Sequence, residues 1–548
     1  MIISATFNVF LIIIITGFSF ALKKFIYQKE VEIYNLDIIY GLFFLILISL
    51  FLNFFFPLRY FLFIIIPIGF YFFFSGFNNK KIKINFFFHF FIIFLLTIII
   101  YKHGDNVDTP MYHLQIIKWL YNEKIVFGLP NLEIRFGSNS LWFNLISILQ
   151  FKYKSFNSIY TFNLIPFSIL IYQMFETKYK LSYLFLSFSL SFILLFSFLH
   201  PSMNGVILNH LHNTDVDTVG MIFFILSFFL FLKYFENENI ENLRLLTISS
   251  LICLTIKLSY CAIVFLPLFA FIKFYKSKFI TALKDKFNIL IISFILLWLI
   301  KNLIISGCLV FLVNFTCFSL PWSPGLEEIE TYSKVVKGFA RDTRERLRYM
   351  DFQYTIESFK WFVPWFKDYA LNNAFLKIFA FITFASSFML ILFSSLNLFV
   401  NSFYKNKYYY LTFLFLILPN FYVWFNAPET RFGWGTIITF CCFLLSVVIY
   451  HFKYLKKLSF LSVKFSIFIF LFLLLFDNKS NLSVKNLMDP YVKNINYSKI
   501  IKVKNYDGFD IYKSTNWKCY DFDKICINTL KDDYKIIKKY NYLIFLNS

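Results

Sequence analysis

Charged side chains are scarce in this sequence: Lys, Arg, Asp and Glu together make up 15% of its 548 residues. A soluble globular chain has about 25% charged and about 45–50% apolar residues, whereas 59% are hydrophobic here. The apolar residues come in runs of about 17–25, the length that spans the hydrocarbon of a bilayer. Such runs must be helical in lipid, because a helix satisfies its own backbone polar groups. The sequence therefore predicts an all-α polytopic membrane protein.

Nucleotide-binding motifs are also missing. The sequence has no G-x-x-x-x-G-K-[ST] loop and no G-x-G-x-x-G turn, and no polar stretch is large enough for a nucleotide-binding domain. We find no internal repeat, the feature expected of a secondary transporter. Chemistry driven by cytoplasmic ATP is therefore not expected, and an outward-facing enzyme would need a donor already carried across the membrane.

The net charge of +22 does not indicate a nucleic-acid partner. The lysines gather in short stretches between apolar runs, where they set the topology of a membrane protein. The abundant residue types, Phe above all with 83 copies, have AT-rich codons, so base composition explains part of the charge. We expect membrane lipid, and not nucleic acid, to be the partner of the basic groups.

About 14 spans of membrane length are predicted. The first run has no basic segment before it and no A-x-A-like cleavage site, so we expect it to be retained as a span. The lysine-rich short loops all fall on one side, the cytoplasm, if the N-terminus is outside and the spans alternate. The predicted spans lie near 5–22, 38–55, 58–76, 86–101, 156–174, 181–199, 217–233, 243–256, 259–273, 287–305, 374–398, 408–425, 434–451 and 460–476.

This topology divides the chain into a multi-span membrane domain, 1–476, and an extracytoplasmic C-terminal tail, 477–548. The N-terminal spans occupy 1–101. Two long external loops follow, at 102–155 and 306–373, and we expect them to carry short helices that lie in the membrane interface.

Most of the eight cysteines lie in apolar segments and are expected to be buried hydrophobes. Cys519 and Cys526 are the exceptions, because they lie in the polar tail. If that tail faces an oxidising exterior, a disulfide between the two is expected.

The first external loop contains two acids, Asp105 and Asp108, at the outer membrane boundary. Apolar residues at near-helical spacing follow from Tyr112 to Leu120. Asp108 therefore has two interpretations. It could cap a helix that begins at Pro110, or it could be a general base that takes a proton from an acceptor hydroxyl. The spacing does not choose between them.

A second polar segment, 200–217, ends in Asp215 and Asp217 and contains three histidines. Its carboxylates could bind a divalent metal such as Mg²⁺ or Mn²⁺. The alternative is a solvated loop with a capped helix start at Thr214 or Asp215, and no fixed metal-ligand spacing favours the metal.

Three cations on the same outer side could bind a phosphate group. Lys257 lies in an otherwise apolar stretch near membrane depth, where an ionisable residue is a functional candidate. Arg431 lies in the turn 426–435, and arginine binds phosphate oxygens in a bidentate manner. Lys301 lies at the outer end of a span. The alternatives are a lysine that reaches the interface and an arginine that pairs with Glu429.

Taken in order, these segments resemble the GT-C class of glycosyltransferases. The closest likeness is to a poorly characterised family of bacterial multi-span proteins near that class. The residues that carry the resemblance are Asp108 to Trp119 (D-x-x-x-YHLQ-x-IKW), Asn131-Leu132 with Arg135, Asn139-Ser140 with Trp142-Phe143, Thr255 to Ser259, Lys301-Asn302 with Ser306-Gly307, Pro428 to Phe432, and Trp517 with Cys519 and Cys526. The chain departs from the family pattern at 128–130, after Ser306, and in the prolines near the tail cysteines.

The resemblance implies a sugar donor on a polyprenyl phosphate, a glycan or lipid acceptor, and inversion at the anomeric carbon. It implies a bacterial cytoplasmic membrane protein whose active site faces the periplasm or exterior. No cofactor is certain, and a metal would be Mg²⁺ or Mn²⁺. The rival functions are a surface-polysaccharide polymerase, ligase or flippase of another class, and, last, a secondary transporter. The implied roles are Asp108, then Asp105, as the catalytic base; Arg431, Lys257 and Lys301 at the donor phosphate; Tyr112, His113, Gln115, Arg135 and Asn139 at the substrate; and Asp215 and Asp217 at a metal.

Overall fold

The fold is known from a computed structural model of the whole chain, in which most of the helical part is described. The residues that the structure describes are 1–28, 31–100, 107–153, 156–176, 180–199, 210–211, 213–276, 280, 282, 284–341, 358–396, 399, 401–452, 469, 471–473, 475–476, 499–506, 509–520, 522, 524–527 and 534–547.

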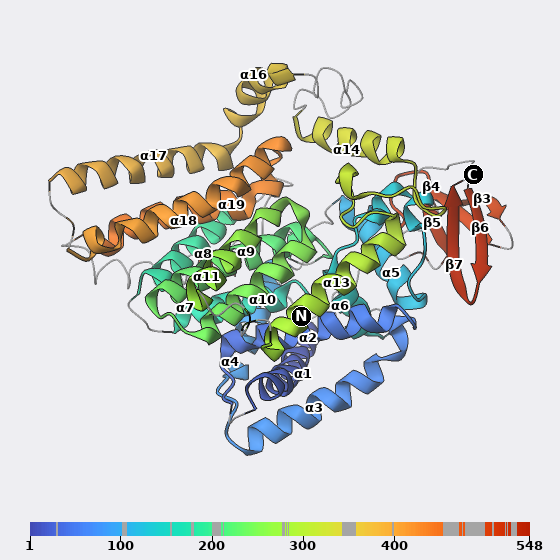
Figure 1. Cartoon of the computed structure of the whole chain (residues 1–548), viewed down its shortest axis with the longest axis horizontal. Helices are drawn as coiled ribbons and strands as arrows, with labels where there is room; N and C mark the ends of the chain where they lie inside the picture. Colours follow the sequence, from blue (N-terminus) through green and yellow to red (C-terminus); the bar gives the residue numbers. More distant parts are fainter. Residues whose placement is uncertain are drawn as a thin grey trace.

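Helices make up most of this structure, and they pack into one body with the strands of the tail at one side (Figure 1). In chain order the helices are α1 (Ile2–Tyr27), α2 (Ile38–Asn53), α3 (Leu62–Asn78), α4 (Phe86–Ile100), α5 (Leu114–Asn122), α6 (Leu141–Leu149), α7 (Leu164–Phe175), α8 (Leu181–Leu199), α9 (Val216–Glu236), α10 (Ile240–Ile256), α11 (Phe265–Tyr275), α13 (Lys286–Ser306), α14 (Leu326–Arg341), α16 (Phe362–Pro364), α17 (Ala374–Ser395), α18 (Asn401–Asn426) and α19 (Thr430–His451).

Among the described helices, eight are long and apolar enough to cross a membrane, which makes the chain a membrane protein. They are α1, α2, α9, α11 with the 3₁₀ turn before it, α13, α17, α18 and α19. The helices α3, α4, α7 and α8 are apolar but shorter. Helices occur at every predicted span up to 434–451. Fewer than the predicted 14 count as spans because several of these helices are too short or not apolar enough. The last predicted span, 460–476, lies largely outside the described residues.

The N-terminal helices pack closely because glycine lies where they cross. α1 contacts α2, α3 and α4. A Cβ on Gly17 of α1 would lie 1.9 Å from the carbonyl oxygen of Gly69 on α3. Small residues allow helix backbones to approach closely in a bilayer, where packing drives association.

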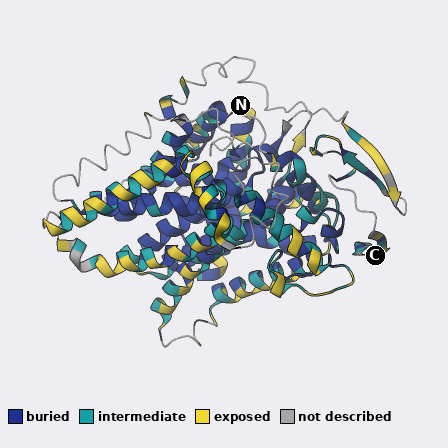
Figure 2. Ribbon diagram, turned by 90° about the horizontal axis from the view of Figure 1, so that it is seen from above, coloured by how far each residue is buried: buried dark blue, intermediate teal, exposed yellow. Residues whose placement is uncertain are grey.

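The centre of the body is α9, which lies among α8, α10 and α19. In the most apolar 18-residue stretch of α9, 89% of the residues are buried, whereas the corresponding share in α17 is 17%. Figure 2 shows the same contrast, with dark blue helices inside and partly exposed ones outside. The N-terminus of α9 is therefore held by a rigid core.

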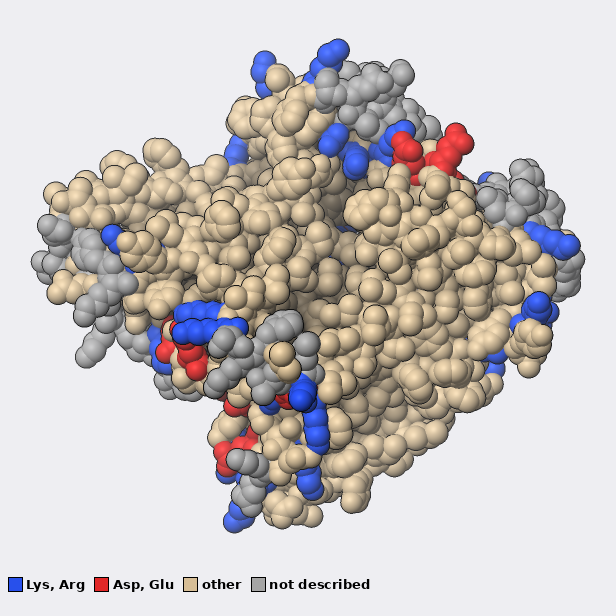
Figure 3. All heavy atoms as spheres, in the orientation of Figure 1, with Lys and Arg blue, Asp and Glu red and all other residues tan. Residues whose placement is uncertain are grey.

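Charged side chains gather at the margins of the face that Figure 3 shows, and a broad uncharged surface lies between them. Large apolar side chains are exposed on the outer helices, among them Phe63, Tyr71 and Phe384, each more than 69% exposed. A soluble monomer rarely exposes a contiguous apolar patch of this kind. The surface fits contact with lipid.

The described part of the C-terminal tail contains five strands, so the expectation of an all-α chain is wrong there. Antiparallel pairing joins β3 to β4 and β6 to β7, while β5 runs parallel to β4. The β6–β7 hairpin turns at Tyr540 and Asn541, both with positive φ, as a two-residue hairpin turn requires. The strands are β1 (Lys152–Tyr153), β2 (Phe156–Asn157), β3 (Ile500–Tyr506), β4 (Phe509–Ser514), β5 (Ile525–Ile527), β6 (Tyr534–Lys539) and β7 (Tyr542–Asn547).

Two disulfides lie in segments that the topology predicts to be external. One joins Cys519 and Cys526, the pair expected from the tail. The other joins Cys308 and Cys317, which we expected to be buried hydrophobes. That expectation was wrong because apolar neighbours hide this pair in the sequence, while the turn after α13 brings the two sulfurs together. Both bonds favour an oxidising environment for these segments.

The close approach of α1 and α3 gives a prediction. Gly17→Ala would force the two backbones apart, and we expect it to lower the stability of the purified protein by about 1–3 kcal/mol. The measurement is the unfolding temperature in detergent. Gly76→Ala is the control, since its Cβ would meet only side-chain atoms, at 3.2 Å. Equal unfolding temperatures for the unaltered protein and Gly17→Ala would contradict this packing.

Candidate active site

Asp108 contacts a cation from a distant part of the chain. It precedes a wide helical turn, η3 (Thr109–His113), which has Pro110 as its second residue and leads into α5. Its side chain accepts no capping hydrogen bond from that turn. Instead, Asp108 Oδ2 lies 2.6 Å from Nη1 of Arg431, 323 residues further along the chain at the start of α19. The carboxylate therefore faces a guanidinium, and Arg431 pairs with Asp108 where the alternative interpretation had Glu429.

A second ion pair extends the first. Lys257 Nζ contacts Asp217 Oδ1, and the other oxygen of Asp217 lies 3.8 Å from Arg431 Nη1. The side chains of Asp108 and Arg431 are 21% and 23% exposed, whereas that of Asp217 is 4% exposed. Opposite charges thus alternate along one cluster, and its Asp108 end is less buried than its Asp217 end.

Two hydrogen bonds hold the segments of this cluster together. The 3₁₀ turn η8 (Leu258–Val264) follows Lys257 directly. Ser259 Oγ donates to the carbonyl of Phe432 over 3.3 Å, and the amide of Gly435 donates to the hydroxyl of Tyr260 over 3.1 Å. The lysine-bearing turn is therefore fixed to the first turn of α19, which carries the arginine.

Asp215 lies beneath the cluster as the N-cap of α9. Its Oδ1 accepts from the amide of Asp217 over 3.1 Å, and its Oδ2 contacts Nδ1 of His210. Burial would raise the pKa of the Asp215 carboxyl, but His210 outweighs it and the pKa falls below its usual value. The capping interpretation of Asp215 holds, and the residue orients the start of α9.

Burial and charge tune the groups beside Asp108. Burial would raise the pKa of the Asp108 carboxyl, but Arg431 and His113 together hold it below its usual value. Burial lowers the pKa of His113 to about 4 and raises that of Tyr112 well above its usual value. Near pH 7 the carboxylate is therefore charged, while His113 and Tyr112 are neutral.

The ammonium of Lys257 is poised between its neighbours. Burial, followed by the charge of Arg431, lowers its pKa to about 7. The nearby carboxylates of Asp215 and Asp108 act in the opposite direction. The lysine therefore loses its proton easily near neutral pH unless an anion stays close to it.

Tyr332 is a site residue that the sequence analysis missed. It lies on α14, in the second external loop. Burial raises its pKa, and Arg135, Glu133 and Asp108 all act on its charge. The guanidinium of Arg135 pairs with Glu133 over 2.9 Å and lies 5.7 Å from the ring centre of Tyr112. No motif points to Tyr332, so only the packing of α14 over the first loop reveals it.

Other predicted site residues have contacts outside the ion-pair cluster. Lys301 is buried, and its Nζ lies 2.5 Å from Oδ1 of Asn144 on α6. Gln115 donates to the carbonyl of Tyr520 in the tail over 2.9 Å. Asn139 lines a small cavity beside α5. Asp105 lies outside the described residues.

The candidate metal ligands are both paired with cationic or imidazole groups. Asp215 contacts His210, and Asp217 contacts Lys257. Within the described part of the chain, no group of three or more His, Cys, Asp or Glu side chains could hold a metal ion. The described residues thus favour charge pairing of these two acids.

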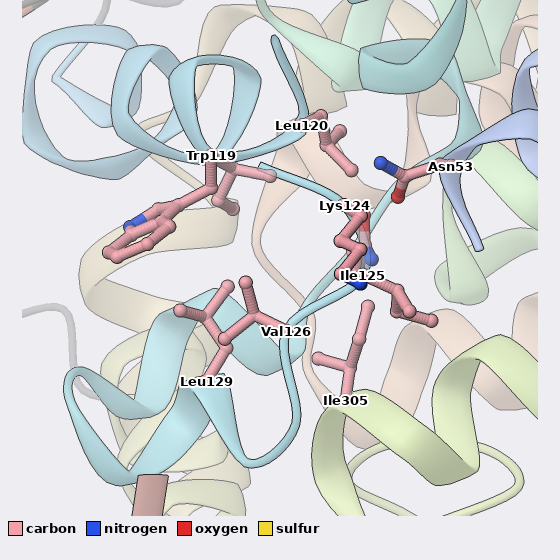
Figure 4. A pocket seen from close by; sticks show the side chains of 10 residues that line it. Asn53, Trp119, Leu120, Lys124, Ile125, Val126, Leu129 and Ile305 are labelled. Carbon is pink, nitrogen blue, oxygen red and sulfur yellow. The ribbon is translucent and has the colours of Figure 1, made fainter. Parts of the chain in front are cut away.

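Two cavities lie away from the cluster. One, with a volume of ≈ 20 Å³, lies between α5, the end of α13 at Ile305, and the segment that carries Lys124 and Leu129 (Figure 4). That volume is close to the space of one water molecule. The other, of ≈ 200 Å³, is lined by apolar residues of α4, α7 and 471–475. The smaller one shows that α5 packs tightly against its neighbours.

Comparison with known proteins finds a family but no characterised relative. A family model described as a domain of unknown function (DUF8201) matches residues 1–438. The matched range includes Asp108, Asp217, Lys257 and Arg431, and it ends before the strands of the tail. No curated protein and no solved structure matches the chain.

The buried pair of Asp217 and Lys257 gives a prediction about stability. Asp217→Asn leaves the lysine without its contact, and removing one partner of a buried pair costs about 3–5 kcal/mol. The double variant Asp217→Asn, Lys257→Met should recover part of that loss. Unfolding in detergent measures both effects. Strictly additive losses in the double variant would show that the two side chains do not interact.

A second prediction concerns pH. The pKa of His113 is about 4 in the folded protein against 6.5 for an ordinary histidine, so the unfolded chain takes up the proton first. Its contribution to stability is therefore complete above pH 6.5 and is lost as the pH falls towards 4, by about 2 kcal/mol at pH 5. His113→Gln should weaken this dependence of the unfolding temperature on pH. An identical dependence in the variant would contradict the burial of a neutral imidazole.

Proposed function

The chain belongs to the DUF8201 family, and we propose that it is a glycosyltransferase of the GT-C type. It would move a sugar from a polyprenyl-phosphate donor to a glycan or lipid acceptor, with inversion. We further propose about 14 spans of the bacterial cytoplasmic membrane, an outside N-terminus, and a site that faces the periplasm or exterior.

The observation that carries the proposal is the contact between Asp108 and Arg431. A carboxylate that can accept a proton and a guanidinium that can bind phosphate lie 2.6 Å apart. Lys257 is a second cation nearby, linked to Arg431 through the carboxylate of Asp217. The base and the phosphate-binding groups must share one pocket in such a reaction, because the attacking oxygen and the leaving phosphate oxygen lie on opposite faces of the same anomeric carbon.

The two disulfides support the proposed side of the membrane. The Cys308–Cys317 bond lies directly after α13, and the Cys519–Cys526 bond lies against the first external loop. Disulfides persist in the bacterial periplasm and at cell surfaces, but rarely in the cytosol. The two bonds thus support the proposal that the loops around Asp108 face an oxidising compartment.

In the proposed reaction, Asp108 takes the proton of the acceptor hydroxyl as its oxygen attacks the anomeric carbon. The bond from that carbon to the phosphate oxygen breaks, and the polyprenyl phosphate leaves with the electron pair. Arg431 and Lys257 stabilise the negative charge on that phosphate. A single displacement inverts the anomeric carbon.

Donor binding would also activate the base. A carboxylate whose pKa is lowered by a bound guanidinium is a weak base. The donor phosphate competes with Asp108 for Arg431 and with Asp217 for Lys257. Once Arg431 turns to the phosphate, Asp108 loses its strongest cation partner and its basicity rises.

The test compares two aspartates that pair with arginine at the same distance. Asp108→Asn should reduce transfer by about 10²–10⁴-fold, the usual contribution of a general base. Asp285→Asn is the matched control, because Asp285 lies 2.6 Å from Arg244 in another part of the molecule. The measurement is the mass of the surface glycan in a deletion strain that carries each variant at equal protein level.

Binding of polyprenyl phosphate to the protein in nanodiscs distinguishes the role of Asp108 as a base from the role of Arg431 in phosphate binding. Arg431→Gln should weaken this binding, while Asp108→Asn should keep or strengthen it because Arg431 is released. If the deletion loses a glycan and Asp108→Asn restores it fully, the proposed function is wrong.

A further inference from the structure

We propose that the C-terminal tail positions the segment that carries Asp108, so that this carboxylate meets Arg431. The tail acts through the loop closed by Cys519 and Cys526, which we call the tail loop, 519–526. Its catalytic meaning rests on the proposed function, but the positioning itself does not.

The tail loop is bonded to the backbone and side chains of the Asp108 segment. The amide of Tyr520 donates to the carbonyl of Pro110 over 2.8 Å. Gln115 Nε2 donates to the carbonyl of Tyr520 over 2.9 Å. Lys118 Nζ donates to the carbonyls of Phe522 and Lys524, the latter over 3.1 Å. These contacts begin two residues after Asp108 and follow the segment for two turns.

The disulfide gives the tail loop its shape. Cys519 and Cys526 are both buried, at 0% and 1% exposure. Cys526 also belongs to β5, which pairs with β4. The bond fixes the loop on the tail sheet, and a closed loop has fewer conformations to lose when its carbonyls accept from Gln115 and Lys118.

A second part of the tail anchors the chain just after α5. The amide of Phe127 donates to the carbonyl of Leu543 over 3.0 Å, and the amide of Phe545 donates to the carbonyl of Phe127 over 2.9 Å. Phe127 thus adds to the edge of β7. Asn131 Nδ2 donates to the carbonyl of Phe545 over 2.9 Å. The tail therefore holds the segment from both ends.

The segment needs such support because it is short. The turn η3 and α5 together run from Thr109 to Asn122, and a helix of this length is marginal on its own in water. Its direction is set by what it packs against. The ion pair of Asp108 depends on that direction, since an error of about 1 Å in a reacting group can cost a hundredfold in rate.

This arrangement gives Gln115 a role different from the substrate binding that the resemblance implies, and Lys118 shares that role. Both side chains donate hydrogen bonds to carbonyls of the tail loop, and Gln115 is 1% exposed. They are positioning residues that act on Asp108 through the backbone. The strands of the tail lie beyond the residues that the family model matches. The matched part of the chain therefore does not include the tail loop that positions Asp108.

The experiment follows hydrogen–deuterium exchange of residues 109–122 in the full-length protein in nanodiscs. Cys519→Ser with Cys526→Ser should raise the exchange rate there about tenfold, as a loss of local stability does, and leave α9 unchanged. Cys308→Ser with Cys317→Ser is the matched control for loss of a disulfide. It should leave 109–122 unchanged.

Substitutions at Lys118 cover the case in which the cysteine variants do not fold. Lys118→Met removes both carbonyl contacts and should raise exchange, while Lys118→Arg keeps a donor and should restore protection. With a working transfer assay, Lys118→Met should lower kcat and leave KM for the donor unchanged.

Unchanged exchange of 109–122 in both the cysteine variants and Lys118→Met would overturn the positioning role. That result is independent of the reaction, because exchange needs no substrate. Conversely, full transfer by Asp108→Asn would remove the proposed function and leave the positioning role standing.

Discussion

The structure depends on one constraint: charges placed at the edge of an apolar helix bundle must neutralise one another. An unpaired ion in such a place costs several kcal/mol of lost hydration. The cluster meets this constraint by alternation, with Asp108 against Arg431 and Asp217 against Lys257. The more buried pair lies inside, and the more exposed pair faces the external loops. In the proposed reaction, the donor phosphate would reach Arg431 of the more exposed pair before Lys257 of the more buried pair.

Rigid elements hold these charges. α9 is the most enclosed candidate span and carries Asp217 in its first turn, capped by Asp215. The start of α19 carries Arg431, and Tyr260 ties it to the turn after Lys257. Only Asp108 lies on a short loop helix outside this frame. The partner that lies outside this frame is thus the one that needs support from another segment, and the tail loop supplies it.

In the proposed reaction, the same cluster would keep Asp108 a weak base until a donor binds. In the structure, Asp108 and Arg431 satisfy each other, which keeps the carboxylate a weak base. A phosphate offers Arg431 a ligand that it binds in a bidentate manner. Binding and activation are then one event, since the guanidinium cannot fully serve both anions.

The sequence by itself determined the membrane class, the positions of the helices and the acids and cations worth testing. Long apolar runs admit only a helix in lipid, so those segments needed no tertiary information. The tail strands were missed because short strands with mixed side chains give a weak periodic signal. The disulfide of Cys308 was missed because its neighbours are apolar.

Only the tertiary structure decided whether Asp108 caps a helix or faces a cation, and which surface Gln115 and Tyr332 serve. Spacing along a chain records the direction of a side chain within its own element, whereas a partner 323 residues away is brought close by packing alone.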